Sequence, residues 1–321
     1  MSDPAQPHDK LFKALTDDPQ RAGALIRERL PAAIVALLAD APPELVEGSF
    51  IDPELRGSQS DRLFRVWMAS GAEAYLYTLV EHKSVPDPGL PLQLLGYMLR
   101  IWQRHAGRDA AKLRSLPPII PLVVYHGART WTIPTAFGDL LAAAAADPAV
   151  RRHHLDFTYI LTDLGRIDDA HLSQQQSLRA GLLALKYALQ ATDPWPVLVS
   201  ILEALPENDP LIRPLLVYIL SVYEDVDRPM LVRAIHQTKP KGEATMLSLA
   251  AREWIAEGRA EGEAKGRAQT LLRQLARRFG PVSDTVRAKV NAADLDTLDL
   301  WLDHVLDAPT LDAVFDESAG Q

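Results

Sequence analysis

Two apolar runs joined by a tight turn restrict the fold of this chain more than any other feature of its sequence. Asp61 opens the first run, Ser70-Gly71 makes the turn, and Glu81-His82-Lys83 closes the second run. Residues 75–80 are nearly continuously apolar, which predicts a strand that is buried on both faces. Burying the charged groups at its end is costly unless they are paired or bind a metal ion. The stretch therefore predicts a hairpin of two strands with a cluster of charged side chains at one end.

Further strands and helices follow the hairpin in alternation. Residues 119–125 and 157–163 have the composition of strands, and Pro121 predicts that the first of them lies at a sheet edge or starts irregularly. Residues 137–146 predict a helix between these two strands. Strands that alternate with helices are typical of an α/β layer, so the sequence predicts a mixed sheet flanked by helices.

The helix that is predicted directly after the hairpin has two different stripes. Its apolar stripe consists of Leu92, Leu95 and Leu99. Its polar and basic stripe consists of Gln93, Tyr97, Arg100 and Arg104. A basic stripe that follows a charged strand end so closely suits contact with a phosphate backbone. The alternative is an ordinary solvated helix face.

The order of predicted strands and helices divides the chain into three parts. Residues 1–167 contain all the predicted strands, residues 168–254 read as an all-α extension, and residues 255–321 read as a small C-terminal helical module. Gly258, Gly262 and Gly266 recur at every fourth position of the helix that opens the third part. Such a stripe permits close helix packing, so a homo-oligomer contact is one interpretation. The other interpretation is an exposed connecting helix. Each glycine costs a helix about 1 kcal/mol relative to alanine.

Composition excludes several classes of protein. The chain has no cysteine, which excludes disulfides and thiolate metal sites and fits a reducing cytoplasm. The N-terminus has no apolar segment of a signal peptide, and no window approaches the ~20 apolar residues of a membrane span. We therefore expect a cytoplasmic protein with no membrane partner. The formal net charge of −8 counts against a nucleic-acid partner, but basic residues cluster locally at residues 100–114 and 151–154.

The charged cluster of the hairpin has the composition of a site for a divalent metal ion. Asp61 and Glu81 would supply carboxylates, and the backbone carbonyl of His82 would add a third oxygen ligand. Mg²⁺ prefers oxygen ligands of this kind and keeps several waters, and Mn²⁺ is the alternative ion. Lys83 would orient a water molecule or stabilise negative charge. This set of groups indicates the hydrolysis of a phosphodiester.

Five segments of the sequence resemble a known family. They are H-D-K-L-F-K from His8, G-S-F-I-D-P-E-L-R from Gly48, S-D-R-L-F-R-V from Ser60, L-V-E-H-K-S from Leu79 and I-I-P-L-V-V-Y-H-G from Ile119. In these segments the chain resembles the Rpn family of recombination-promoting nucleases, also called YhgA-like transposases, in the PD-(D/E)XK nuclease superfamily. The resemblance covers roughly the first two thirds of the chain. The C-terminal part resembles a domain of uncharacterised function that often follows such nucleases.

The resemblance implies a Mg²⁺-dependent DNA endonuclease that promotes recombination. It implies a restriction-endonuclease-like fold, so that residues 1–167 would be the nuclease core. Carried over to this sequence, the superfamily motif places the metal-binding carboxylates at Asp61 and Glu81 and the catalytic lysine at Lys83. Several family members have glutamine instead of this lysine, so the chain follows the general superfamily pattern here.

The resemblance also implies further parts of the site. Gln93 matches a polar residue on the helix that follows the motif. The superfamily often uses one more acidic residue on an early helix or loop. Glu47 and Glu54 are the two candidates for it, and the sequence does not decide between them. DNA is the expected partner.

Two other functions stay open. A transposase would join strands as well as cut them, and a strand-transfer domain or a helix-turn-helix would favour this function, but neither is recognised in the sequence. An inactive nuclease fold would act as a DNA-binding or oligomerising scaffold. Loss of Asp61, Glu81 or Lys83 would favour the scaffold, and all three residues are present. The negative net charge is the feature that keeps it open.

Overall fold

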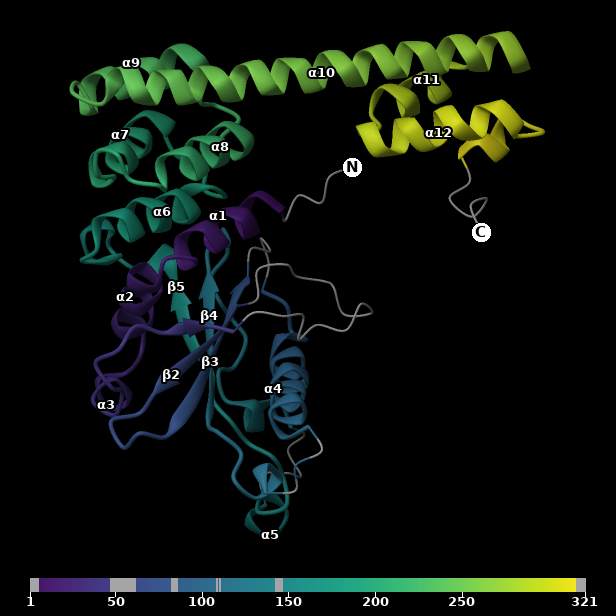
Figure 1. Ribbon diagram of the computed structural model, residues 1–321. Helices are drawn as coiled ribbons and strands as arrows, with labels where there is room; N and C mark the ends of the chain where they lie inside the picture. The colour runs from purple at the N-terminus through teal and green to yellow at the C-terminus, as the bar shows by residue number, and fades with distance from the viewer. Residues whose placement is uncertain are drawn as a thin grey trace. The chain divides into compact units, whose positions relative to one another are not determined.

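The computed structural model of the chain describes residues 6–46, 62–81, 86–107, 109, 111–141 and 147–315 (Figure 1). Within these ranges, the side chains of residues 6, 79–81, 253–254 and 256–262 lie outside the description. Contacts divide the chain into one unit of Ala5–Leu247 and a second unit that contains Ser248–Gln321.

In its described part, the first unit contains one mixed sheet of five strands in the order β1-β2-β3-β4-β5. The strands are β1 (Glu44–Leu45), β2 (Arg62–Trp67), β3 (Glu73–Glu81), β4 (Ile119–Tyr125) and β5 (Ile160–Asp163). β1, β2 and β3 pair antiparallel, whereas β4 and β5 run parallel to β3. The predicted α/β fold with a mixed sheet is therefore confirmed.

β2 and β3 form the hairpin that the sequence predicted. Gly71 has φ +83° in the turn, a left-handed conformation that glycine adopts without steric cost. The amide of Met68 donates to the carbonyl of Ala72 across the turn at 2.8 Å. β3 pairs with β2 on one side and β4 on the other, and Leu76 and Tyr77 on its two faces are buried. The prediction of a strand buried on both faces is thus confirmed.

Helices cover both faces of this sheet (Figure 1). α4 (Leu90–Ala106) connects β3 to β4 and packs on one face, where Leu94, Tyr97 and Ile101 join the core. α2 (Pro19–Arg29) and α3 (Ala32–Val35) pack on the other face. α4 is the crossover helix that a parallel β3–β4 pair requires.

The buried face of α4 differs from the predicted one. Leu92 and Leu99 were assigned to its apolar stripe, but their side chains are 63% and 51% exposed. The core uses Leu90, Leu94 and Met98 instead. That part of the prediction is wrong because apolar residues occur on almost every side of this helix, so their spacing does not select one face.

Two details of the predicted sheet are also corrected. Pro121 does not lie in an edge strand, because β4 lies between β3 and β5. β5 pairs with β4 only from Leu122 onward, so the missing N–H of Pro121 costs no bond to β5. Of the helix predicted at residues 137–146, Phe137–Leu140 form a 3₁₀ helix, η3, which ends in extended backbone at Leu141. Residues 142–146 lie outside the described residues.

The rest of the first unit is mainly helical. Its helices are α1 (Gln6–Thr16), α5 (Pro148–Arg151), α6 (Gln176–Tyr187), α7 (Pro194–Ala204), α8 (Ile212–Val222) and α9 (Arg228–Thr238). Its short 3₁₀ helices are η2 (Lys112–Arg114), η5 (Leu164–Arg166) and η6 (Asp169–His171). Asp18, Asp147 and Asp193 each cap a helix that begins with proline, a frequent way to start a helix. α1 packs against α2, α6 and α8.

The second unit is helical throughout its described part. It contains most of α10 (Glu243–Phe279), and also α11 (Asp284–Asn291), α12 (Leu295–Asp307) and η7 (Asp312–Phe315). Leu271, Leu275 and Trp301 lie in its core. The predicted helical C-terminal region is therefore confirmed. None of the helices that the structure describes has the length and apolar character needed to span a bilayer.

Two predictions about the chain's organisation stay predictions. The domain boundaries at residues 167 and 254 are not decided by the division into two units, which falls inside α10. The homo-oligomer contact through Gly258, Gly262 and Gly266 is also open. A Cβ atom added at Gly266 would meet no atom within 4 Å, so this part of α10 has an open surface.

Candidate functional site

The carboxyl ends of the three parallel strands meet at one edge of the sheet. Glu81 is opposite Tyr125 in the β3–β4 pair, and Tyr125 is opposite Asp163 in the β4–β5 pair. These three residues therefore form one row across the sheet. In α/β proteins with parallel strands, ligands bind at this edge.

β2 begins at the same edge. It runs antiparallel to β3, and its first residue, Arg62, lies opposite Thr78. The Arg62 guanidinium donates to the Thr16 hydroxyl at 3.2 Å and to the Lys13 carbonyl at 2.9 Å, and it forms an ion pair with Asp17. These bonds tie the start of β2 to the end of α1. Asp61 directly precedes this anchored residue in the sequence.

Several predicted site residues lie outside the described residues. They are Glu47, Glu54, Asp61, His82 and Lys83. Glu81 is described as the last residue of β3, but its side chain is not. The structure therefore defines the strand ends that carry the motif, and the arrangement of its side chains stays a prediction.

A buried polar cluster lies at this edge, and the sequence did not indicate it. The cluster consists of His8 of α1, Tyr218 of α8 and His126 after β4, each at most 6% exposed. Asp9, next to His8, and Thr78 of β3 are buried as well. The ring centroids of His8 and His126 are 4.9 Å apart, and His8 Nδ1 lies 2.7 Å from the hydroxyl of Tyr218 in α8. In the sequence, two adjacent polar residues near the start of a helical pattern indicate helix capping at most. Their position next to each other at the start of an amphipathic helix was the only available signal.

His126 connects this polar cluster to the strand that ends at Glu81. It directly follows Tyr125, the partner of Glu81 in the parallel β3–β4 pair. Neighbouring strands lie about 4.8 Å apart and rise about 3.3 Å per residue, so the Cα atoms of His126 and Glu81 are about 6 Å apart. α1, through His8, therefore packs within one residue of the end of the motif-bearing strand.

Asp163 ends the row on β5. Burial raises the pKa of its carboxyl group, and two interactions partly oppose this shift. The amide of Gly165 donates to Asp163 Oδ1 at 3.1 Å, and the Arg166 guanidinium lies 3.6 Å from Asp163 Oδ2. A carboxyl group with a raised pKa at the carboxyl edge of a parallel sheet is a candidate functional group.

The predicted polar stripe of α4 runs away from this edge. Gln93 Nε2 donates to the hydroxyl of Tyr97 at 3.2 Å, and the Tyr97 ring lies 5.0 Å from the ring of Tyr77. Tyr97 is buried in the core, so the structure gives its ring a packing position. Gln93 lies one helical turn closer to the start of α4.

The two arginines of the stripe, Arg100 and Arg104, lie farther along α4 than Gln93 and Tyr97. Arg104 lines a cavity beside Tyr75, near the beginning of β3. Tyr75 and Glu81 are six positions apart along the strand, about 20 Å at 3.3 Å per residue. Arg100 lies on α4 between Tyr97 and Arg104. Its side chain is half-buried, and its Nη1 atom has no hydrogen-bond partner among the described residues. The structure therefore does not bring Arg104 to the end of β3 that carries the motif.

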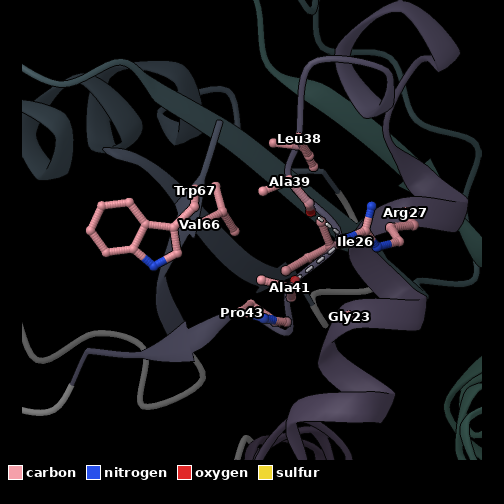
Figure 2. A pocket seen from close by; sticks show the side chains of 9 residues that line it. All are labelled: Gly23, Ile26, Arg27, Leu38, Ala39, Ala41, Pro43, Val66 and Trp67. Carbon is pink, nitrogen blue, oxygen red and sulfur yellow. Dashed lines mark hydrogen bonds between the residues drawn. The ribbon is translucent and has the colours of Figure 1, made fainter. Parts of the chain in front are cut away.

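A second, much smaller cavity lies between α2 and β2. Figure 2 shows Arg27 on its wall, with hydrogen bonds to the carbonyls of Ala39 at 2.7 Å and Ala41 at 3.4 Å. Its volume is about 10 Å³, enough for a single water molecule. It is therefore too small for a substrate. Among the described residues, no three histidine, aspartate or glutamate side chains gather closely enough to hold a metal ion.

Comparison with known proteins agrees with the sequence resemblance. The family model described as "Putative transposase, YhgA-like" matches residues 6–213, more than half of the chain. Recombination-promoting nuclease RpnD of Escherichia coli O157:H7 is 28% identical over 248 residues, which cover 77% of this chain and 93% of RpnD. RpnA of E. coli K12 is 28% identical over 248 residues, 77% of this chain and 82% of RpnA.

Not every relative is named as an active enzyme. Inactive recombination-promoting nuclease-like protein RpnE of E. coli K12 is 28% identical over 181 residues, which cover 56% of this chain and 58% of RpnE. No solved structure matches the chain. The family model and the relatives agree on one assignment: the chain belongs to the YhgA-like transposase family and is a distant homologue of the Rpn recombination-promoting nucleases.

Proposed function

We propose that the chain is a metal-dependent endonuclease that hydrolyses phosphodiester bonds in DNA, on a restriction-endonuclease-like fold. The pairing of β2 with β3 supports this most directly. Arg62 starts β2 opposite Thr78, and β3 ends at Glu81. The two sequence segments that carry the motif thus adjoin the same end of one hairpin.

The donor set fits Mg²⁺ or Mn²⁺ by its chemistry. The carboxylates of Asp61 and Glu81 and the backbone carbonyl of His82 are oxygen ligands, which suit these ions. A bound ion would lower the pKa of a water molecule and neutralise charge on the phosphate group. Lys83 would orient the attacking water or stabilise the charge that develops on the phosphate oxygens.

The names of the relatives support the same reaction and define the main alternative. RpnD and RpnA are named as recombination-promoting nucleases, which also supports a role in recombination. RpnE is named as inactive, so membership of the family does not by itself make an enzyme. This chain has an acid at 61, an acid at 81 and a lysine at 83, the complete motif of the proposed site.

A plasmid-nicking assay tests the proposal. Purified wild-type protein is expected to nick supercoiled DNA with Mg²⁺ or Mn²⁺ and to lose this activity in EDTA. Asp61→Ala and Glu81→Gln should each lower the rate by a factor of about 100 or more, because metal binding supplies several kcal/mol to the transition state. Glu203→Gln is the matched control, since Glu203 is exposed on α7 and belongs neither to the motif nor to either of the two cavities.

Each outcome of the assay has a distinct meaning. Cleavage that survives both Asp61→Ala and Glu81→Gln would show that the site is wrongly assigned. A wild-type protein that binds DNA but never cuts it would be a scaffold. Products in which cut ends are joined to new strands would favour a transposase.

A further inference from the structure

A basic cavity lies along β2 and β3, and its basic side chains gather beside Tyr75, toward the end of β3 that is remote from the motif. Its volume is about 260 Å³, and it opens between α4, the segment after it, and strands β2 and β3. Leu63 and Tyr75 contribute to its wall from the strands, and Arg104, His105 and Lys112 contribute basic side chains. Its volume falls just below the ~300–1,000 Å³ of pockets for whole small molecules, so it suits a smaller group.

The basic side chains come from two separate elements. Arg104 and His105 lie in the last turn of α4, where basic residues also complement the helix dipole. The dipole does not account for Lys112, which belongs to the separate 3₁₀ helix η2. An acidic side chain also approaches this set: a carboxylate oxygen of Glu73 lies 3.5 Å from Nδ1 of His105. Convergence of three basic groups on one cavity favours an anionic ligand.

We propose that this basic cavity holds a phosphate group. A guanidinium and an ammonium group offer a phosphate several charge-assisted hydrogen bonds. The His105 imidazole, whose ring lies 6.1 Å from the Tyr75 ring, adds a further donor or acceptor. The phosphate belongs either to the DNA backbone or to a free phosphate ligand.

The DNA version rests on the proposed nuclease function and gives the cavity a definite task. Tyr75 lies about 20 Å from Glu81 along β3. At 3.4 Å per base pair, this distance corresponds to about six base pairs of duplex. A phosphate held here would anchor DNA that extends from the proposed cleavage site along α4, and so would fix its direction across the sheet.

The test measures DNA binding in EDTA, so that it does not depend on cleavage. Fluorescence anisotropy with a short labelled duplex would compare wild-type protein, Arg104→Gln/Lys112→Gln and a control, Arg213→Gln/Lys241→Gln. The control removes the same two charges from exposed positions on α8 and just before α10. Arg104 and Lys112 are exposed too, so neither double variant is expected to unfold, which circular dichroism would verify.

The expected results differ between the two double variants. Arg104→Gln/Lys112→Gln should bind DNA roughly three- to tenfold more weakly, the effect of removing two exposed charges from the binding surface. The slope of log K against log salt should fall in magnitude by about 1 for each phosphate that the variant no longer neutralises. The control should keep the wild-type slope. If both double variants bind DNA alike, the DNA version of the proposal is overturned.

A second measurement distinguishes a free phosphate from DNA. Inorganic phosphate, compared with chloride at equal ionic strength, should raise the Tm of wild-type protein if the cavity holds a free phosphate. Arg104→Gln/Lys112→Gln should then lose this shift while its DNA binding stays unchanged. Absence of both effects would overturn the phosphate site altogether. It would leave the proposed nuclease function intact, because that function is tested separately through Asp61 and Glu81.

Discussion

His8 Nδ1 and the hydroxyl of Tyr218 form a buried hydrogen bond of 2.7 Å between residues 210 positions apart. The bond joins α1, the first described helix, to α8. The ring of His8 also lies 4.9 Å from the ring of His126, which follows β4. The first helix therefore holds the carboxyl edge of the sheet and the later helices together, across the predicted domain boundary at residue 167.

Removing the hydroxyl of Tyr218 should destabilise the protein. Tyr218→Phe removes the hydrogen bond between the buried His8 Nδ1 and α8. Loss of a buried hydrogen bond should lower the free energy of unfolding by about 1–3 kcal/mol. Urea denaturation would measure this loss. Tyr187→Phe is the matched control, because the Tyr187 hydroxyl bonds to Asp169, which keeps a bond from Lys186. Equal losses in the two variants would contradict a special role of the His8–Tyr218 bond.

Adding a methyl group at Gly181 should separate α1 from α6. A Cβ atom at this position would lie 2.3 Å from Cδ2 of Leu15, a fully buried side chain of α1. Overpacking of this kind typically costs about 1–3 kcal/mol, which thermal or urea unfolding of Gly181→Ala would detect. Gly266→Ala should instead stabilise its helix by about 0.5–1 kcal/mol, because the added Cβ meets no atom within 4 Å. A neutral Gly181→Ala variant would show that α1 and α6 repack without cost.

Asp163 should make stability depend on pH in mildly acidic solution. Burial raises the pKa of the folded state above the ordinary value of 3.8, so folding favours the protonated form. This contribution to stability is complete below pH 3.8 and is lost as the pH rises through the raised pKa. Asp163→Asn keeps an acceptor for the Gly165 amide but does not ionise. The stability of Asp163→Asn relative to wild type should therefore increase as the pH rises from below about 4, in urea titrations at a series of pH values.

Lys83 should tolerate glutamine better than alanine. Glutamine retains a hydrogen-bond donor that orients a water molecule, although it lacks the positive charge. Lys83→Gln should therefore keep measurable Mg²⁺-dependent nicking, whereas Lys83→Ala should lose about two further orders of magnitude, the lower end of the range for a positioned group. The nicking rate at saturating metal would be compared for both variants. Identical rates would assign no orienting role to this side chain.

Local signals in the sequence identified the centre of the sheet. The turn at Gly71 and the apolar run of β3 predicted the hairpin, and the run Ile119–Tyr125 predicted β4 with the bounds that the structure has. β1 escaped notice because a strand of two residues, Glu44–Leu45, has no detectable alternation. The predicted face of α4 was wrong because its leucines surround the helix, and the side that is buried is the one on which Tyr97 contacts Tyr77.

The candidate site was predictable only where it depends on the hairpin. Pairing of two adjacent strands brings the segments before β2 and after β3 to one end, which sequence spacing alone can indicate. The contacts of His8 with His126 and Tyr218 depend on how three distant segments pack, and no short spacing encodes them. The position of Arg104 beside Tyr75 likewise depends on the direction in which α4 crosses the sheet.

The parallel pairing of β3 with β4 has a consequence during synthesis. β2 precedes β3 by a short turn, so the hairpin can close soon after both strands are made, but 37 residues separate Glu81 from Ile119. At about 5–20 residues per second, the ribosome needs roughly 2–7 s to produce them. During that interval one edge of β3 has no partner strand, and its backbone N–H and C=O groups lack the bonds that β4 later provides. The nascent chain thus passes through a state in which the hairpin exposes a strand edge that can pair with another chain.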